Sequence, residues 1–325
     1  MTNNTSRRPT IKDIARIAGV SIATVSYVFN DTKHVSDEVR QRVLKSADHL
    51  GYKVNKSART LRTGTSKTIG LVLPDLTNPF FPEIAQAVEA EARLNGFATI
   101  LFDTQGLPEL EKRAIELLAE YRVDGVVWAL IGASPAEQPP FPTVLIDRPV
   151  EGFDGVYTDH ARGGQLAAEL AGSLGHSRLG LLSGPQDVAS AAMRRAGFMS
   201  KLTPGSKIVW EEPVPFGRDL PSAAVSALER NEVSFIFAAN DLVALSAMAV
   251  LERAKIDVPE EVSVLGYDDI SWAELPQIAL STIRQPLPDL GRAAFQLLQQ
   301  RMDQPGRDIA HMMLEPCVQT RSTTR

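Results

Sequence analysis

The alternation of apolar strands with helices from residue 68 onward restricts the fold more than any other feature of the sequence. TIGLVLPD, ATILFD, VDGVVWAL, TVLID, RLGLLSG, IVW, SFIFAA and VSVLGYDD are predicted strands. Between them lie predicted helices over residues 80–95, 109–121, 161–174, 189–202, 221–231 and 242–254. Strands that are apolar on both faces and alternate with helices indicate parallel α/β structure. Because residues 68–325 are too many for one doubly wound sheet, we expect two lobes.

The first fifty residues follow a different pattern. Thr10 and Asp13 resemble a capping box, and the helix that follows can end at Gly19. Ser21 can cap a second helix over residues 22–29, and Ser36 can cap a third that reaches Leu50. The predicted inward side chains are Ile11, Ile14, Ala15, Ala18, Val25, Val28, Val39, Val43, Leu44 and Leu50. A helix, a glycine turn and a second helix have the form of a helix-turn-helix.

Charge divides the chain in the same place. The 325 residues carry a net charge of −5. Residues 1–68 contain 13 Lys/Arg and 5 Asp/Glu, net +8, whereas residues 69–325 contain 21 and 34, net −13. A basic head on an acidic body indicates that the head alone meets a polyanion. Charge by itself leaves open the alternative of a solubilising tail.

Several function classes lack their sequence signals. Cys317 is the single cysteine, and the five histidines lack metal-ligand spacing, so we expect no disulfide, metal or cofactor. LLSGP is not a nucleophile elbow, and GTSKT is not a phosphate loop. We therefore expect no enzyme. With no apolar stretch of roughly 18 residues and no signal peptide, we expect a cytoplasmic protein that does not associate with a membrane.

The segment DIARIAGVSIATVSYVFN resembles the lactose/galactose repressor (LacI/GalR) family of bacterial transcription regulators. IGLVLPDLTNPFF, LIDRP, GHSRLGLLSGP, AANDLVALSAM, VSVLGYDDISWAEL, LSTIRQP and QTRSTT match along nearly the whole chain, in the family's order. The resemblance implies a DNA-binding head over residues 1–54, a hinge helix over 55–67 and an effector-binding core over 68–325. That core would have two Rossmann-like lobes resembling periplasmic sugar-binding proteins. The N-lobe would hold about 68–159 and 286–314, and the C-lobe about 160–285 and 315–325.

The resemblance also implies which head residues meet operator DNA. Ile22, Ala23 and Tyr27 match the family's specificity positions near the start of the second helix. None is Arg, Asn or Gln, so we expect contacts with thymine methyl groups and a tyrosine hydroxyl contact to carry the base reading. For Ile22, a place in the small core is the alternative, and for Ser21 it is capping alone. The remaining predicted DNA-binding residues of the head are Thr10, Ser21, Thr24, Ser26, Asn30, His34 and Ser36.

The hinge NKSARTLRTG supplies three more predicted DNA-binding residues, Asn55, Ala58 and Leu61. In the family, paired hinge helices of a dimer insert a leucine between base steps in the minor groove, and Leu61 matches it. Packing of Leu61 on the core is the alternative.

Polar and aromatic side chains follow several strands. Because ligands of parallel sheets bind beyond the carboxyl ends of the strands, these residues predict a cleft between the lobes. The resemblance implies a sugar-like effector there. The predicted effector-binding residues are Asn78, Phe80, Phe81, Asp147, Arg148, Arg194, Asn240, Asp268 and Gln285, with Phe216 and Trp272 as weaker candidates. As alternatives, Phe80 could belong to the core and Arg148 to an ion pair.

Together these features predict a homodimeric, ligand-responsive repressor that binds a pseudo-palindromic operator, without specifying the effector or the sign of its effect. The chain lacks a leucine heptad after QTRSTTR, so we expect no tetramer. Two rivals are a solute-binding protein of a sugar transport system and a sugar-modifying α/β enzyme.

Overall fold

The computed structural model describes residues 9–30, 33–52, 65–130 and 138–325. The chain divides into two compact units, Met1–Ser66 and Lys67–Arg325, which are described separately below.

Within its described residues, the first unit contains three helices, α1 (Ile11–Ala18), α2 (Ile22–Asn30) and α3 (Asp37–His49). The backbone N–H of Thr10 donates to the Asp13 carboxylate at 2.9 Å, and Gly19 ends α1 with a φ of +64°. Glycine adopts that left-handed conformation at the least steric cost, which favours the turn between α1 and α2 at this position. The small core gathers side chains from all three helices around the buried residues Ile14, Ala15, Ala18, Val25, Val28, Val43 and Ala47.

Two details of the head differ from the prediction. Leu44 was expected inside, but it is 42% exposed, because Val43 and Ala47 already fill the inner face of α3. Ser36 does occupy the N-cap position of α3, but its side chain makes no capping hydrogen bond.

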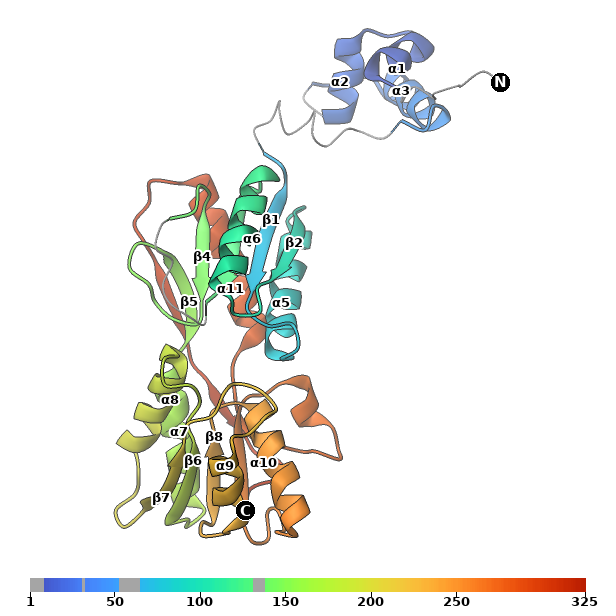
Figure 1. Cartoon of the computed structure of the whole chain (residues 1–325). Helices are drawn as coiled ribbons and strands as arrows, with labels where there is room; N and C mark the ends of the chain where they lie inside the picture. The colour runs from blue at the N-terminus through green and yellow to red at the C-terminus, as the bar shows by residue number, and fades with distance from the viewer. Residues whose placement is uncertain (1–8, 31–32, 53–64, 131–137) are drawn as a thin grey trace. The chain divides into compact units, whose positions relative to one another are not determined.

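The second unit is built on two six-stranded sheets (Figure 1). The N-lobe is the first sheet together with its helices. The strand order of this sheet is β11 (His311–Leu314), β5 (Asp154–Thr158), β4 (Thr143–Ile146), β3 (Gly125–Ala129), β1 (Thr68–Leu73) and β2 (Ala98–Asp103). The C-lobe is the second sheet together with its helices. The strand order of this sheet is β12 (Cys317–Gln319), β10 (Ser281–Arg284), β9 (Ser263–Asp268), β8 (Phe235–Ala238), β6 (Arg178–Leu182) and β7 (Lys207–Glu212). The described pairings are parallel except for that of β12 with β10.

Helices cover both faces of each sheet, which is why the strands are apolar on both sides. In the N-lobe, α5 (Phe80–Leu94) and α11 (Leu287–Asp303) pack on one face and α6 (Pro108–Glu120) on the other. In the C-lobe, α9 (Ser222–Glu229) and α10 (Asp241–Ala254) cover one face, and α7 (His160–Ser173) and α8 (Ala189–Ser200) cover the other. The predicted fold class, a helix-turn-helix head with an α/β core of two lobes, is confirmed.

The chain passes between the two sheets after β5, after β10 and after β11. Ile270 and Leu242 of the C-lobe are buried in the hydrophobic core of the N-lobe. The backbone N–H of Ser271, in the short 3-10 helix η1 (Ser271–Glu274), donates to the Glu83 carboxylate of α5 at 2.9 Å. The lobes are therefore in direct contact beside the ends of their strands. No helix among the described residues has the length and apolar character needed to cross a membrane.

Candidate DNA-binding surface and ligand-binding cavity

The first turn of α2 presents the predicted base-reading residues. Ile22 is 50% exposed and Ala23 is exposed, whereas Val25 and Val28 point into the core of the head. The alternative that Ile22 is a core residue is therefore wrong. Ser21 caps α2, because its hydroxyl accepts the backbone N–H of Thr24 at 3.0 Å. A capping hydroxyl at a helix N-terminus remains compatible with a phosphate contact.

The other predicted head residues whose side chains are described lie at or near the surface. Tyr27 is partly exposed, and the ammonium group of Lys33 lies 5.2 Å from the centre of its ring. His34 and Ser36 are exposed in the loop before α3, and Thr10, Thr24 and Ser26 are partly exposed. Asn30 is the last residue of α2. The predicted hinge contacts, Asn55, Ala58 and Leu61, lie outside the described residues.

In the core, the ends of strands from both lobes meet around a small cavity. Its free space is about 20 Å³, room for about one water molecule. Its lining is Asn78, Phe80, Phe81, Asp147, Ser190, Arg194, Phe216, Asn240 and Asp268. Eight of these nine residues are among the predicted effector-binding set. Side chains from distant parts of the sequence therefore converge at one place, as expected for the carboxyl ends of parallel strands.

Arg194, on α8, is the most highly connected side chain of the cavity. Its guanidinium lies 3.4 Å from the Asp268 carboxylate and donates to the backbone carbonyl of Ala239 at 2.6 Å. The guanidinium carbon also lies 3.8 Å from the centre of the Tyr267 ring. This buried cation is thus held by charge, by a hydrogen bond and by an aromatic face.

Asp268 closes the C-lobe side of the cavity at the end of β9. Its carboxylate accepts a hydrogen bond from the Gln285 side chain at 2.8 Å. Burial raises the pKa of Asp268 to about 6, although Arg194 favours the ionised form. A buried carboxylate with one cation and one amide partner can still accept hydrogen bonds from ligand hydroxyl groups.

The two lobes place an aspartate with unusual backbone geometry on the cavity. Asp147 follows β4 of the N-lobe with a φ of +101°, and Asp268 ends β9 of the C-lobe with a φ of +113°. Residues other than glycine avoid this region, and such strain concentrates at functional sites. Oδ2 of Asp147 is buried without a hydrogen-bond partner.

Amide and aromatic side chains complete the lining. Oδ1 of Asn240 accepts the backbone N–H of Val243 at 2.8 Å, and Oδ1 of Asn78 accepts that of Phe80 at 3.1 Å. Because these bonds use the oxygen atoms, both amide groups can donate toward the cavity. Phe80 and Phe81 meet edge to face with ring centres 5.1 Å apart.

Comparison with known proteins places these two sites in a family. Residues 10–55 match the model of bacterial regulatory proteins of the lacI family, and residues 168–324 match a periplasmic binding protein-like domain. The chain is 32% identical to the HTH-type transcriptional repressor PurR of Vibrio atlanticus (strain LGP32) over 97% of its own length and 98% of the relative. It is 30% identical to the ribose operon repressor of Escherichia coli (strain K12), over 97% of its own length and 99% of that relative.

The chain belongs to the LacI family.

Solved structures agree with this assignment. The Lac repressor bound to ONPG in its repressed state aligns with a TM-score of 0.86 at 26% identity, over 98% of this chain and 100% of the other. A LacI family transcriptional regulator from Enterococcus faecalis V583 with bound ribose aligns with a TM-score of 0.70 at 30% identity, over 79% of this chain and 98% of the other. The predicted family and the predicted class of function, a ligand-responsive transcriptional repressor, are confirmed.

Three predicted effector-binding residues of this LacI-family chain lie outside the cavity lining. Gln285 reaches the cavity through its bond to Asp268 and lines a smaller space beside it. The indole ring of Trp272 packs against the core of the N-lobe and faces the guanidinium of Arg218 at 5.1 Å. Arg148 follows Asp147 and is partly buried, with its Nε atom enclosed.

Sequence analysis missed Ser190. It is the second residue of α8 and lies one helical turn before Arg194, on the same face. That i, i+4 spacing was the available signal.

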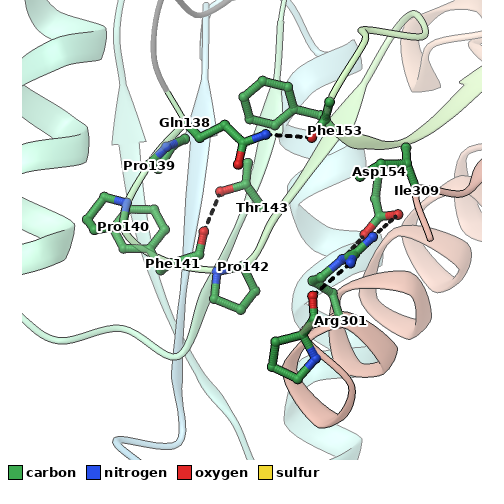
Figure 2. A pocket seen from close by; sticks show the side chains of 12 residues that line it. Gln138, Pro139, Pro140, Phe141, Pro142, Thr143, Phe153, Asp154, Arg301 and Ile309 are labelled. Atoms are coloured by element: carbon green, nitrogen blue, oxygen red, sulfur yellow. Dashed lines mark hydrogen bonds and ion pairs between the residues drawn. The ribbon is translucent and has the colours of Figure 1, made fainter. Parts of the chain in front are cut away.

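A larger hollow of the LacI-family core lies elsewhere (Figure 2). It has about 340 Å³ of free space beside the starts of β4 and β5, whereas the cavity above lies beside strand ends. The carboxylate of Asp154, which lines the hollow, is bound by Arg301 and by Arg307, each at 2.8 Å. The side-chain amide of Gln138 donates to the carbonyl of Gly152 at 2.8 Å. These polar groups are engaged within the fold, so the hollow offers a ligand fewer open partners than the cavity.

Proposed function

We propose that this LacI-family repressor binds a five-carbon sugar such as ribose between its lobes and, as a homodimer, couples that binding to a pseudo-palindromic operator. The observation that carries the proposal is the convergence of Asn78, Asp147, Arg194, Asn240 and Asp268 on one cavity walled by phenylalanines. Sugars need charged or amide partners for their hydroxyl groups and flat apolar faces for their C–H surfaces. The relatives named for ribose support the choice of a pentose.

Each side chain has a role that follows from its position. Arg194 and the amides of Asn78 and Asn240 would donate to ring and hydroxyl oxygens, while Asp147 and Asp268 would accept from hydroxyl groups. Phe80, Phe81 and Phe216 would sandwich the ring. Gln285 would hold the Asp268 carboxylate in place, and Ser190 would add a hydroxyl from α8. Arg148 remains a proposed contact at the edge.

The size of the cavity supports a switch based on lobe movement. About 20 Å³ is far below the roughly 300 Å³ of ordinary ligand pockets, so entry requires separation of the lobes. A ligand that bridges both lobes would favour one angle between them, and effector and operator affinity would then be reciprocally coupled. Glu83–Ser271 and the burial of Ile270 are the contacts that such a movement would break.

On DNA, the exposed first turn of α2 would read base edges and Leu61 of the hinge would enter the minor groove. The Lac repressor dimer bound to operator, which aligns with a TM-score of 0.84 at 26% identity, supports the dimeric arrangement. We place the head at residues 1–54, the hinge at 55–67 and the core at 68–325, and we place the protein in the cytoplasm, where it meets DNA. We propose no catalytic role.

A purine is the second candidate effector. The relatives named PurR are 32% identical, and Phe80, Phe81 and Phe216 offer faces on which a base could stack. The acidic pair Asp147 and Asp268 favours the sugar, because carboxylates accept from several hydroxyl groups at once.

Calorimetry and thermal unfolding with D-ribose, D-xylose, D-glucose, hypoxanthine and guanine separate the candidates. We expect ribose to raise the melting temperature and to change the affinity for DNA from the protein's own promoter region. Stabilisation by a purine and by none of the sugars would overturn the proposed effector.

DNA binding should weaken steeply from about 50 to 200 mM salt, since each neutralised phosphate adds about −0.9 to the slope of log affinity against log salt concentration. Salt-independent binding would contradict the role of the basic head.

A further inference from the structure

His160 joins the ligand-binding groups of the two lobes. It is the first residue of α7, where the chain enters the C-lobe, and it is 2% exposed. Its Nε2 atom lies 3.2 Å from the backbone carbonyl oxygen of Asp147, in the N-lobe. Its Nδ1 atom lies 3.3 Å from Nε of Arg194 and 3.2 Å from the hydroxyl of Tyr267, both in the C-lobe. One imidazole thus connects the residue after β4 with the buried arginine of the cavity.

The crossing of α7 and α8 holds His160 against Arg194. A Cβ atom on Gly164 would lie 2.0 Å from the carbonyl oxygen of Arg194, and one on Gly197 would lie 2.0 Å from that of Ala161. The two helices can approach this closely only because both positions lack side chains. The distance between the imidazole and the guanidinium is therefore set by backbone packing and is not a chance contact of two flexible side chains.

The hydrogen bonds require one protonation state. Nε of Arg194 can only donate, so Nδ1 of His160 must accept, and Nε2–H then donates to Asp147. Burial lowers the pKa of His160, and the charge of Arg194 lowers it further, while Asp147 opposes this shift. The hydroxyl of Tyr267 on β9 also faces it, Asp159 precedes it on its own segment, and Asp268 of β9 contacts its partner Arg194.

We propose that His160 is a positioning residue for the effector: its neutral imidazole aligns Arg194 within the cavity and connects it to the Asp147 strand end, so tight effector binding requires the neutral form. This rests on the proposed function for the role of Arg194 and for ribose as the probe. A protonated imidazole would turn an N–H toward the guanidinium, which would remove the bond and add repulsion. His160 therefore acts through Arg194 and need not touch the ligand.

The first test needs no ligand. In the full-length protein labelled with ¹⁵N-histidine, the resonance that disappears in His160→Asn is assigned to His160. We expect it to show the neutral Nε2–H form from pH 8 down to below the ordinary histidine pKa of about 6.5. We also expect the Arg194 Nε–H to be protected from exchange with solvent and to lose that protection in His160→Ala. A histidine that titrates at about 6.5, or unchanged protection in His160→Ala, would overturn the proposal.

The second test measures ribose affinity by calorimetry. His160→Ala should lose at least tenfold, because Arg194 loses a buried partner. His160→Asn should recover to within about threefold of wild type, since its side-chain oxygen can take the place of Nδ1 as the acceptor. Equal losses in both variants would indicate only a packing role and would overturn the proposal.

The pH profile separates positioning from packing. Wild-type affinity should be constant while His160 stays neutral. It should fall only at the pH, below about 6.5, at which the resonance test shows the free protein taking up the proton, because ligand binding must then expel that proton. His160→Asn should show a weaker fall, the remainder coming from Asp268. His311→Asn, an exposed histidine on β11, should keep the wild-type profile. Identical profiles for wild type and His160→Asn would refute the role of the neutral form. Absence of ribose binding by wild type would instead refute the proposed effector, and the resonance test would still decide the role of His160.

Discussion

The guanidinium of Arg194 lies 3.4 Å from the carboxylate of Asp268, and both side chains are only 5% exposed. The arginine comes from the interior of α8 and the aspartate from the end of β9. A buried ion pair of this kind contributes little net stability, but removal of one member leaves an unpaired charge in a poorly solvated place. The pair is therefore better explained by ligand binding than by stability of the fold.

Replacement of Arg194 by alanine should reduce ribose affinity by at least tenfold, because a charged hydrogen-bond donor to the ligand is lost. Operator affinity without effector should change little, since the head is a separate unit. Calorimetry and a gel shift measure the two quantities. The matched control is Arg195→Ala, whose side chain is 45% exposed and pairs with Glu211 outside the cavity. Equal effects of both substitutions would remove Arg194 from the site.

Asp268→Asn should remove a pH-dependent contribution to stability, while leaving Arg194 without its charged partner at every pH. The pKa of Asp268 is raised to about 6 in the folded protein, above its ordinary value near 3.8. Its protonated form therefore favours folding below about pH 4, and this contribution is lost as pH rises through 6. Above pH 6 the charged carboxylate destabilises the fold by on the order of 3 kcal/mol, a figure that already includes the attraction to Arg194.

We expect the melting temperature of Asp268→Asn, taken relative to that of wild type, to be higher at pH 7.5 than at pH 4. A difference that does not depend on pH would contradict the raised pKa. Ribose affinity of the variant should fall at pH 7.5, where it lacks the charged acceptor.

Ile22→Ala should alter operator preference without unfolding the head, because the side chain is half exposed. Competition gel shifts with operators changed at single base pairs should show relaxed discrimination at one position, where a mismatch ordinarily costs about 1–3 kcal/mol. Val25→Ala, three residues later on α2 and fully buried, provides the contrast. It should destabilise the head and weaken all DNA binding together. Loss of head stability in Ile22→Ala would contradict its proposed role.

Leu61→Ala should lower operator affinity and reduce DNA bending, because a truncated side chain cannot hold an unstacked base step, whose opening needs a few kcal/mol. Non-specific DNA binding, which phosphate contacts carry, should barely change, and neither should ribose affinity. Mobility of permuted fragments measures the bend. A variant with a lower melting temperature and equal losses in specific and non-specific binding would instead favour packing of Leu61 on the core.

Much of the candidate site was predictable because polar residues at the ends of buried strands have few structural explanations. Asn240 lies two residues after β8 and Asp268 ends β9, so parallel topology alone brings them to one edge. Ser190 and His160 were not predictable in this way. Both lie in the first turns of helices, where serine and histidine are ordinary, and their roles depend on how α7 crosses α8.

Local physical chemistry within the sequence determined the elements of this protein: the capping pair Thr10 and Asp13, the glycine that ends α1, and the apolar runs that become strands. These depend on residues a few positions apart, so they can be derived from the sequence alone. Tertiary structure decided which side chains share an environment. Ile22 and Leu44 are both exposed, although their local patterns also allowed a place in the core. His160 contacts Arg194 and Asp147, because helix crossings and lobe contacts act between residues far apart in the chain. Burial and the pKa values that follow from it arise only from that packing.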